Sequence, residues 1–104
     1  MTKKIIKENL STQFKDKIIV ITGSTQGSGA ETAKLLAMRG AKGITICGRN
    51  EKNGKSVKKE IELLGAECIY IKADLEKLKD CKKIISQTLK RFGTINSLIN
   101  CAAY

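Results

Sequence analysis

The sequence contains no histidine and no tryptophan, and only 4% of its 104 residues are aromatic. Without histidine, the commonest acid–base group and metal ligand of proteins is missing. The 4 cysteines, at positions 47, 68, 81 and 101, include no Cys-x-x-Cys pair. We therefore expect structural thiols in a reducing compartment and no bound metal. No apolar run approaches the ~20 residues of a membrane-spanning helix.

Acidic residues are also few. The chain has 20 lysines and arginines against 10 aspartates and glutamates, which gives a formal net charge of +10. Such an excess favours an anionic partner. The lysines fall mainly on outward positions of expected helices, and aromatic side chains that could stack on bases are scarce. We therefore expect solvated helix faces and no nucleic-acid partner, with a basic RNA-binding protein as the less favoured alternative.

The length allows one small domain, and the 41% hydrophobic content is typical of a globular chain. Residues 1–13 form a basic lead-in without the long apolar core of a secretory signal, and Glu8 argues against a transit peptide. We expect one domain over residues 14–104, no membrane partner and a cytoplasmic location.

The most informative segment is an apolar run, Ile18 to Ile21, followed by a loop with glycines at positions 23, 27 and 29. A helical pattern comes directly after it. This order is typical of dinucleotide-binding turns, because glycine lets backbone N–H groups and the helix N-terminus approach a pyrophosphate. The spacing Gly-x-x-x-Gly-x-Gly is weak support by itself, and an ordinary strand-to-helix turn is the alternative.

The rest of the chain alternates between helical and strand patterns. We expect a helix over residues 31–39, a second helix that Gly65 ends, and a third over residues 76–92. Strands are expected over residues 43–47 and 68–71, and residues 97–103 are expected to form the last strand and its turn. The second helix would align Val57, Ile61 and Leu64, and the apolar side of the third would carry Leu78, Cys81, Ile85, Leu89 and Phe92. This alternation implies right-handed βαβ crossovers, and therefore an α/β fold with a parallel sheet in the strand order 3-2-1-4. The apolar pair Leu98-Ile99 suits a central strand.

The second expected strand ends in Gly48-Arg49, where folds of this kind recognise the adenosine ribose. No acidic residue stands there before Glu51. A carboxylate would repel a 2′-phosphate, whereas a guanidinium pairs with it through charge-assisted hydrogen bonds. We therefore predict NADP(H) in preference to NAD(H). The alternative is that Arg49 is one of many surface cations.

Four motifs, in order, resemble the short-chain dehydrogenase/reductase family: Thr22-Gly23-x-x-x-Gly27-x-Gly29, Gly48-Arg49, Ala73-Asp74-Leu75 and Asn100-Cys101-Ala102-Ala103. The resemblance covers residues 14–103. It implies a Rossmann-like fold and hydride transfer between a nicotinamide and an alcohol or carbonyl substrate. Gln26 departs from the pattern, because NADP-preferring members often have a basic residue at that position.

The resemblance implies cofactor contacts at the following positions: Gly23, Ser24, Thr25, Gln26, Gly27, Ser28, Gly29, Arg49, Asp74, Leu75, Asn100 and Ala102. In this assignment the glycines hold the pyrophosphate, Arg49 binds the 2′-phosphate, and Asp74 accepts from the adenine amino group with Leu75 beside the ring. Asn100 braces the centre of the sheet and Ala102 lies near the cofactor. Asp74 has an alternative as the N-cap of the helix expected from Glu76.

The catalytic serine, tyrosine and lysine that the family uses have no counterpart in this chain. Tyr70 has Asp74 four residues later and Tyr104 is the last residue, so neither forms Tyr-x-x-x-Lys. We assign no catalytic residue and expect the cofactor-binding part of an oxidoreductase, truncated before the catalytic residues and inactive by itself. A non-catalytic nucleotide-binding module or a gene remnant is the alternative.

Overall fold

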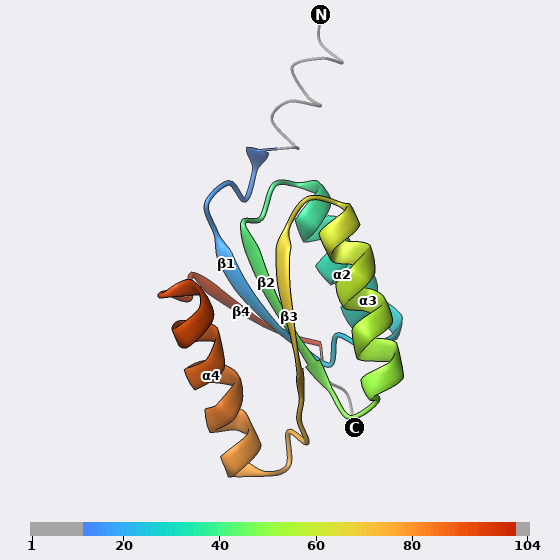
Figure 1. Ribbon diagram of the computed structural model, residues 1–104, viewed down its shortest axis with the longest axis vertical. Coiled ribbons are helices and arrows are strands. Elements are labelled where there is room, and N and C mark those ends of the chain that lie inside the picture. Colours follow the sequence, from blue (N-terminus) through green and yellow to red (C-terminus); the bar gives the residue numbers. More distant parts are fainter. Residues whose placement is uncertain (1–11, 102–104) are drawn as a thin grey trace, which may run out of the picture.

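The computed structural model describes residues 12–101 (Figure 1). In chain order the elements are β1 (Ile18–Thr22), α2 (Gly27–Met38), β2 (Gly43–Gly48), α3 (Glu51–Leu63), β3 (Glu67–Lys72), α4 (Leu78–Phe92) and β4 (Ser97–Asn100). The strands form a 4-stranded sheet in the order β3-β2-β1-β4, and every neighbouring pair is parallel. The predicted α/β fold and strand order are confirmed.

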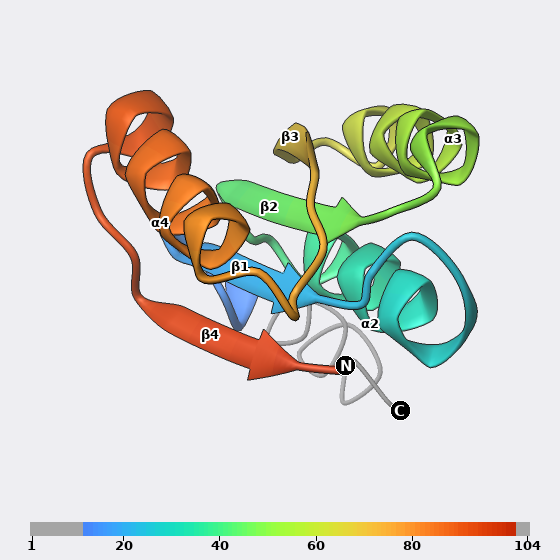
Figure 2. The same cartoon turned by 90° about the horizontal axis from the view of Figure 1, so that it is seen from below.

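Helices cover the two faces of the sheet unequally (Figures 1 and 2). α2 and α3 lie on one face, and α4 lies alone on the other. Because side chains of a strand alternate between faces, Ile19 and Ile21 pack in the cluster that α2 and α3 complete, whereas Val20 packs in a smaller cluster with Ile84 of α4. The core therefore lies mainly between the sheet and the α2–α3 layer.

Two helices begin at positions other than those predicted. α2 starts at Gly27 rather than residue 31, because the glycine loop itself supplies the first turn, with Ala30 N bonded to the Gln26 carbonyl oxygen. α4 starts at Leu78 rather than residue 76, because a turn precedes it in which Lys77 N donates to the Asp74 carbonyl oxygen.

The prediction for the apolar side of α4 was wrong in part. The helix buries Ile84 and Thr88 against the sheet, whereas Leu78, Ile85 and Leu89 are exposed. Thr88 is accommodated because its hydroxyl shares a hydrogen bond of 2.9 Å with the Thr45 hydroxyl of β2. A buried hydroxyl that has a hydrogen-bond partner can thus lie on the helix face that contacts the sheet, while leucines of the same helix lie on the exposed face.

One smaller expectation also fails, at the end of α3. Leu64 caps the end of α3 and is exposed, although Val57 and Ile61 are buried as predicted. β4 lies at the edge of the described sheet, as the predicted order 3-2-1-4 requires, and its Leu98 is 55% exposed. In the described sheet β4 has β1 as a neighbour on one side and forms the outer edge on the other.

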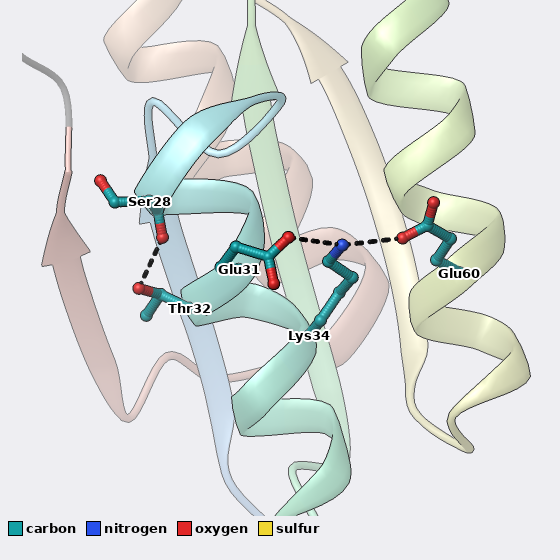
Figure 3. Close-up of polar contacts among 5 residues, drawn as sticks. All are labelled: Ser28, Glu31, Thr32, Lys34 and Glu60. Carbon is teal, nitrogen blue, oxygen red and sulfur yellow. Dashed lines mark hydrogen bonds and ion pairs between the residues drawn. The ribbon is translucent and has the colours of Figure 1, made fainter.

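Lysine 34 joins the two helices that cover the larger core (Figure 3). Its ammonium lies 2.8 Å from Glu31 of its own helix and 3.0 Å from Glu60 of α3. These hydrogen bonds, first to Glu31 and then to Glu60, raise the pKa of Lys34 above its ordinary value. In the first turn of α2, Thr32 donates to the carbonyl oxygen of Ser28 at 2.8 Å.

Two of the cysteines lie inside the fold. Burial raises the pKa of the Cys47 thiol to about 11 and that of Cys68 to about 12. Both thiols therefore stay protonated near neutral pH, as expected of structural residues.

Among the described residues, no helix is both long enough and apolar enough to span a bilayer.

Candidate functional site

A cavity of about 380 Å³ opens at the carboxyl ends of the strands. Its walls come from the glycine loop, the turn between β2 and α3, and the segment after β3. Most of the predicted cofactor residues line it: Gly23, Thr25, Gln26, Gly27, Ser28, Gly29, Arg49, Asp74 and Leu75. Parallel α/β sheets bind ligands at this end, beside the point where the strand order reverses, which here lies between β1 and β4.

The glycine loop folds back on itself at the start of α2. A Cβ at Gly29 would lie 2.0 Å from the carbonyl oxygen of Gly23, so any side chain there would force the loop open. Gly27 has a φ of +59°, and a Cβ built on it would meet no atom within 4 Å. The loop is therefore tightly packed at Gly29 and open toward the cavity at Gly27.

The N-terminus of α2 is electrostatically uncompensated. Its N-cap, Gln26, makes no side-chain cap hydrogen bond, and the first turn carries no acidic residue. The first N–H groups of a helix lack intrahelical partners, and the helix carries about half a positive charge at that end. Beside Gly27, this arrangement forms a cradle suited to an anion.

Ser24 is placed differently from the other loop residues. It is fully buried, its hydroxyl donates to the Ile21 carbonyl oxygen at 2.6 Å and accepts from Cys47 N at 2.9 Å, and it does not line the cavity. These bonds join the ends of β1 and β2. The structure thus gives the Ser24 hydroxyl internal partners, and the cofactor contact predicted for this residue stays a prediction.

Asn100 and Ala102 complete the predicted set. The Thr22 hydroxyl at the end of β1 donates to Asn100 Oδ1 at 2.7 Å, so Asn100 connects neighbouring strands rather than lining the cavity. This contact agrees with the bracing expected of Asn100. Ala102 lies outside the described residues.

The second wall is the turn after β2. Arg49 is exposed at its tip and lines the cavity. Gly48 packs against Thr25 so closely that a Cβ there would lie 2.6 Å from the Thr25 hydroxyl oxygen. Asn53 Nδ2 donates to Gln26 Oε1 at 3.2 Å, which links the first turn of α3 to the glycine loop. The sequence motif Gly48-Arg49 did not predict that Gly48 itself lines the cavity. Its position at the end of a strand, next to the glycine loop, is the feature that could have predicted this.

The third wall follows β3. Asp74 Oδ1 accepts from Glu76 N at 3.0 Å, and Asp74 N donates to Asp80 Oδ2 at 2.8 Å. The second bond is the main reason that the pKa of Asp80 is lowered. Lys77, not Asp74, is the N-cap of α4, so the alternative role for Asp74 as a helix cap was wrong. Its side chain instead closes the short turn that precedes the helix.

The cavity is also lined by residues that were not among the predicted cofactor contacts. Glu76 and the half-buried Cys101 both line it, together with Ala73. No motif distinguished Glu76 from the other acidic residues of the chain. The cavity therefore combines Arg49 and a helix N-terminus with the carboxylates of Asp74 and Glu76 on another wall.

Within residues 12–101, no group of three or more histidine, cysteine, aspartate or glutamate side chains is placed to hold a metal.

The parallel sheet, the glycine loop and the cavity at the strand ends define an α/β domain of the dinucleotide-binding type. A family model described as short chain dehydrogenase matches residues 17–104. The chain belongs to this family.

Curated relatives and solved structures agree with this membership. The chain is 36% identical over 91 residues to an uncharacterized oxidoreductase, YxnA, of Bacillus subtilis, and 36% identical over 87 residues to the 11-beta-hydroxysteroid dehydrogenase A of Sesamum indicum. These alignments cover 88% and 83% of this chain but only 25% of each relative. The chain thus spans about a quarter of their length.

Two solved structures show the fold with different cofactors. An NADH-dependent reductase, A1-R′, complexed with NAD, superposes with a TM-score of 0.77 at 31% identity, over 86% of this chain and 37% of that one. An actinorhodin polyketide ketoreductase with NADPH gives a TM-score of 0.80 at 25% identity, over 86% and 34%. The similar structures therefore bind a nicotinamide dinucleotide but do not distinguish NADP(H) from NAD(H) for this chain.

Proposed function

We propose that this chain binds NADP(H) in preference to NAD(H) in the cavity at the strand ends. The observation that carries the proposal is the position of Arg49 on the cavity wall, beside the uncapped N-terminus of α2. The nearest acidic residue in sequence, Glu51, does not line the cavity and is paired with Lys55 at 3.1 Å. The ribose end of the site therefore offers a cation and no carboxylate from this turn.

The residue roles follow from the walls of the cavity. Gly23, Gly27 and Gly29 with the first turn of α2 would hold the pyrophosphate, and Arg49 would pair with the 2′-phosphate. Asp74 would accept from the adenine amino group, with Leu75 against the ring. Two hydrogen bonds support this role, because they hold the backbone and the carboxylate of Asp74 in place at the cavity wall.

We further propose that the chain is the cofactor-binding part of an oxidoreductase. The bound nicotinamide would supply hydride transfer to or from an alcohol or carbonyl carbon. The chain's own residues bind and orient the dinucleotide, and none is assigned to proton transfer. Binding without turnover is therefore expected of these 104 residues alone.

The test is a titration of the chain with NADPH and NADH, followed by cofactor fluorescence. Arg49→Ala should weaken NADPH binding roughly ten- to a hundredfold, because hydrogen bonds to charged groups contribute about 1.5–3 kcal/mol. NADH binding should change little. Lys59→Ala is the matched control, since it removes an exposed cation of α3 that does not line the cavity. Equal losses for both cofactors, or tighter binding of NADH by the wild type, would contradict the preference.

The net charge of +10 favours a second candidate function, which is general binding of polyanions such as RNA. Such binding weakens steeply with added salt because it depends on counterion release. NADPH binding in a defined cavity should saturate and persist at moderate salt. A salt titration of both ligands therefore separates the two functions.

A further inference from the structure

Tyr70 lies behind the cofactor cavity rather than in it. It stands in β3, opposite Ile46 of β2, and its side chain lies on the α2–α3 side of the sheet. Its hydroxyl donates to the Gly48 carbonyl oxygen at 2.8 Å. Gly48 directly precedes Arg49, so the tyrosine contacts the turn that carries the proposed 2′-phosphate ligand.

The ring can reach this position because α3 leaves space for it. A Cβ at Gly54, in the first turn of α3, would lie 2.2 Å from Tyr70 Cε1. Gly54 is buried, and the ring lies against its backbone. Burial is also the main cause of the raised pKa of Tyr70. The hydroxyl therefore keeps its proton, and its ability to donate, at neutral pH.

Gly48 is held from several sides at once. Its carbonyl oxygen accepts from Ala73 N at 3.1 Å as well as from Tyr70, and its Cα packs against Thr25. Since the peptide unit is planar, fixing the Gly48 carbonyl also fixes the N–H and the Cα of Arg49, the atom from which its side chain leaves the turn. The exposed guanidinium has no comparable restraint from an ion pair in the described residues.

We infer that Tyr70 is a positioning residue for cofactor selectivity, which orients Arg49 toward the 2′-phosphate by holding the Gly48 carbonyl. This inference rests on the proposed function. It assigns selectivity partly to a hydroxyl that does not touch the cofactor. A preorganised cation binds more tightly because less conformational freedom is lost when the ligand arrives.

The decisive variant is Tyr70→Phe, which keeps the ring against Gly54 and removes only the hydroxyl. The Ala73 hydrogen bond remains, so the sheet should stay intact. We expect NADPH affinity to fall roughly three- to fivefold, as for the loss of one neutral hydrogen bond. NADH affinity should fall less, because NADH has no 2′-phosphate for Arg49 to bind. The NADPH/NADH affinity ratio is therefore the readout that a purely structural role would not change.

Two controls make the result specific. Thr88→Val removes a buried hydroxyl hydrogen bond on the α4 side, remote from the cavity, and should lower the melting temperature without changing the affinity ratio. In an Arg49→Ala background, Tyr70→Phe should have almost no further effect on NADPH, because the residue through which it acts is gone.

The outcomes separate the two proposals. If the wild type binds neither cofactor, the proposed function is wrong and the role of Tyr70 falls with it. If the wild type prefers NADPH but Tyr70→Phe leaves the ratio unchanged, only the positioning role is wrong. Additive effects of the two substitutions would also overturn it, whereas a lowered ratio that vanishes in the Arg49→Ala background supports it.

Discussion

The two faces of the sheet differ in how they are buried. One is covered by α2 and α3, and the other by α4 alone. On the first, Ile44, Ile46 and Ile61 are completely buried. On the second, Ile85 and Leu89 of α4 remain 37% and 45% exposed, and Leu98 of β4 is 55% exposed. Each helix layer leaves some apolar side chains exposed, including Leu63 of α3 at 80%. The faces therefore differ in the size of the buried cluster, which is larger beneath α2 and α3.

The difference matters for the candidate site because two of the cavity walls belong to the well-covered side. The glycine loop leads into α2, and the Arg49 turn leads into α3. Lys34 and Glu60 join these two helices, and Asn53 of α3 donates a hydrogen bond to Gln26 at the start of α2. The elements proposed to hold the phosphates therefore rest on the side of the sheet that has the larger buried cluster.

The largest expected effect tests the covered face. Ile61→Ala should lower the free energy of unfolding by about 2–5 kcal/mol, because it removes a fully buried side chain and leaves a cavity. Leu89→Ala, the comparison on the other face, should change it by less than about 1 kcal/mol. Urea denaturation of both variants measures the contrast. A similar loss for Leu89→Ala would show that another surface covers Leu89 in solution.

A second contrast lies within one helix. Ile84 of α4 is 3% exposed and its neighbour Ile85 is 37% exposed. Ile84→Ala should cost about 2 kcal/mol, near the lower end for buried isoleucine because its cluster is small, whereas Ile85→Ala should cost under about 1 kcal/mol. Thermal unfolding of the pair decides which face of α4 contacts the sheet. A larger loss at Ile85 would mean that another surface covers that face, and sedimentation would then detect self-association.

This pair also explains where prediction from the sequence succeeds and fails. Apolar runs such as Ile18–Ile21 identify strands, because a parallel strand buried on both faces has few polar residues. The strand order and most of the cavity followed from the glycine loop and the alternation of elements. In α4, however, Ile84 and Ile85 are adjacent, so spacing alone supports two overlapping faces. Which face packs depends on Thr45 of β2, whose hydroxyl pairs with Thr88.

The same limit applies to the site. The glycines were recognisable because their conformation and packing demand them, as at Gly29. Glu76 reaches the cavity only through the tertiary fold, and no local pattern marks it. Cys101 belongs to the fourth motif, but nothing in that motif assigns it a place in the cavity. The internal role of the Ser24 hydroxyl likewise depends on Cys47, which follows it by more than twenty positions and lies on another strand.

A smaller effect concerns the polar contact that attaches α4. Thr88→Val should destabilise the fold by about 1–2 kcal/mol, because the buried Thr45 hydroxyl loses its partner. Replacing both threonines with valine should recover most of that loss, since two apolar groups of similar shape need no hydrogen bond. Chemical denaturation of the single and double variants tests this. A double variant no more stable than Thr88→Val would assign the loss to packing rather than to the unpaired hydroxyl.

The smallest expected effect returns to the α2–α3 side. Lys34→Met removes the ion pairs with Glu31 and Glu60 and should cost about 0.5 kcal/mol, the usual scale for pairs near the surface. Because these pairs raise the pKa of Lys34 above 10.5, their stabilisation is fully present below that pH and is lost as the pH rises through the raised value. The difference between wild type and Lys34→Met should therefore be constant from neutral pH to about pH 10 and shrink above it.

The matched control is Lys59→Met, which removes the same charge from an exposed position of α3 that forms no ion pair within the described residues. On this strongly basic chain, removing any lysine relieves some repulsion. Subtracting the control isolates the bridge between the helices. If Lys34→Met also weakens NADPH binding while Lys59→Met does not, the helix contact helps to hold the cavity walls. If neither variant affects NADPH binding, the loop contacts alone keep those walls in place.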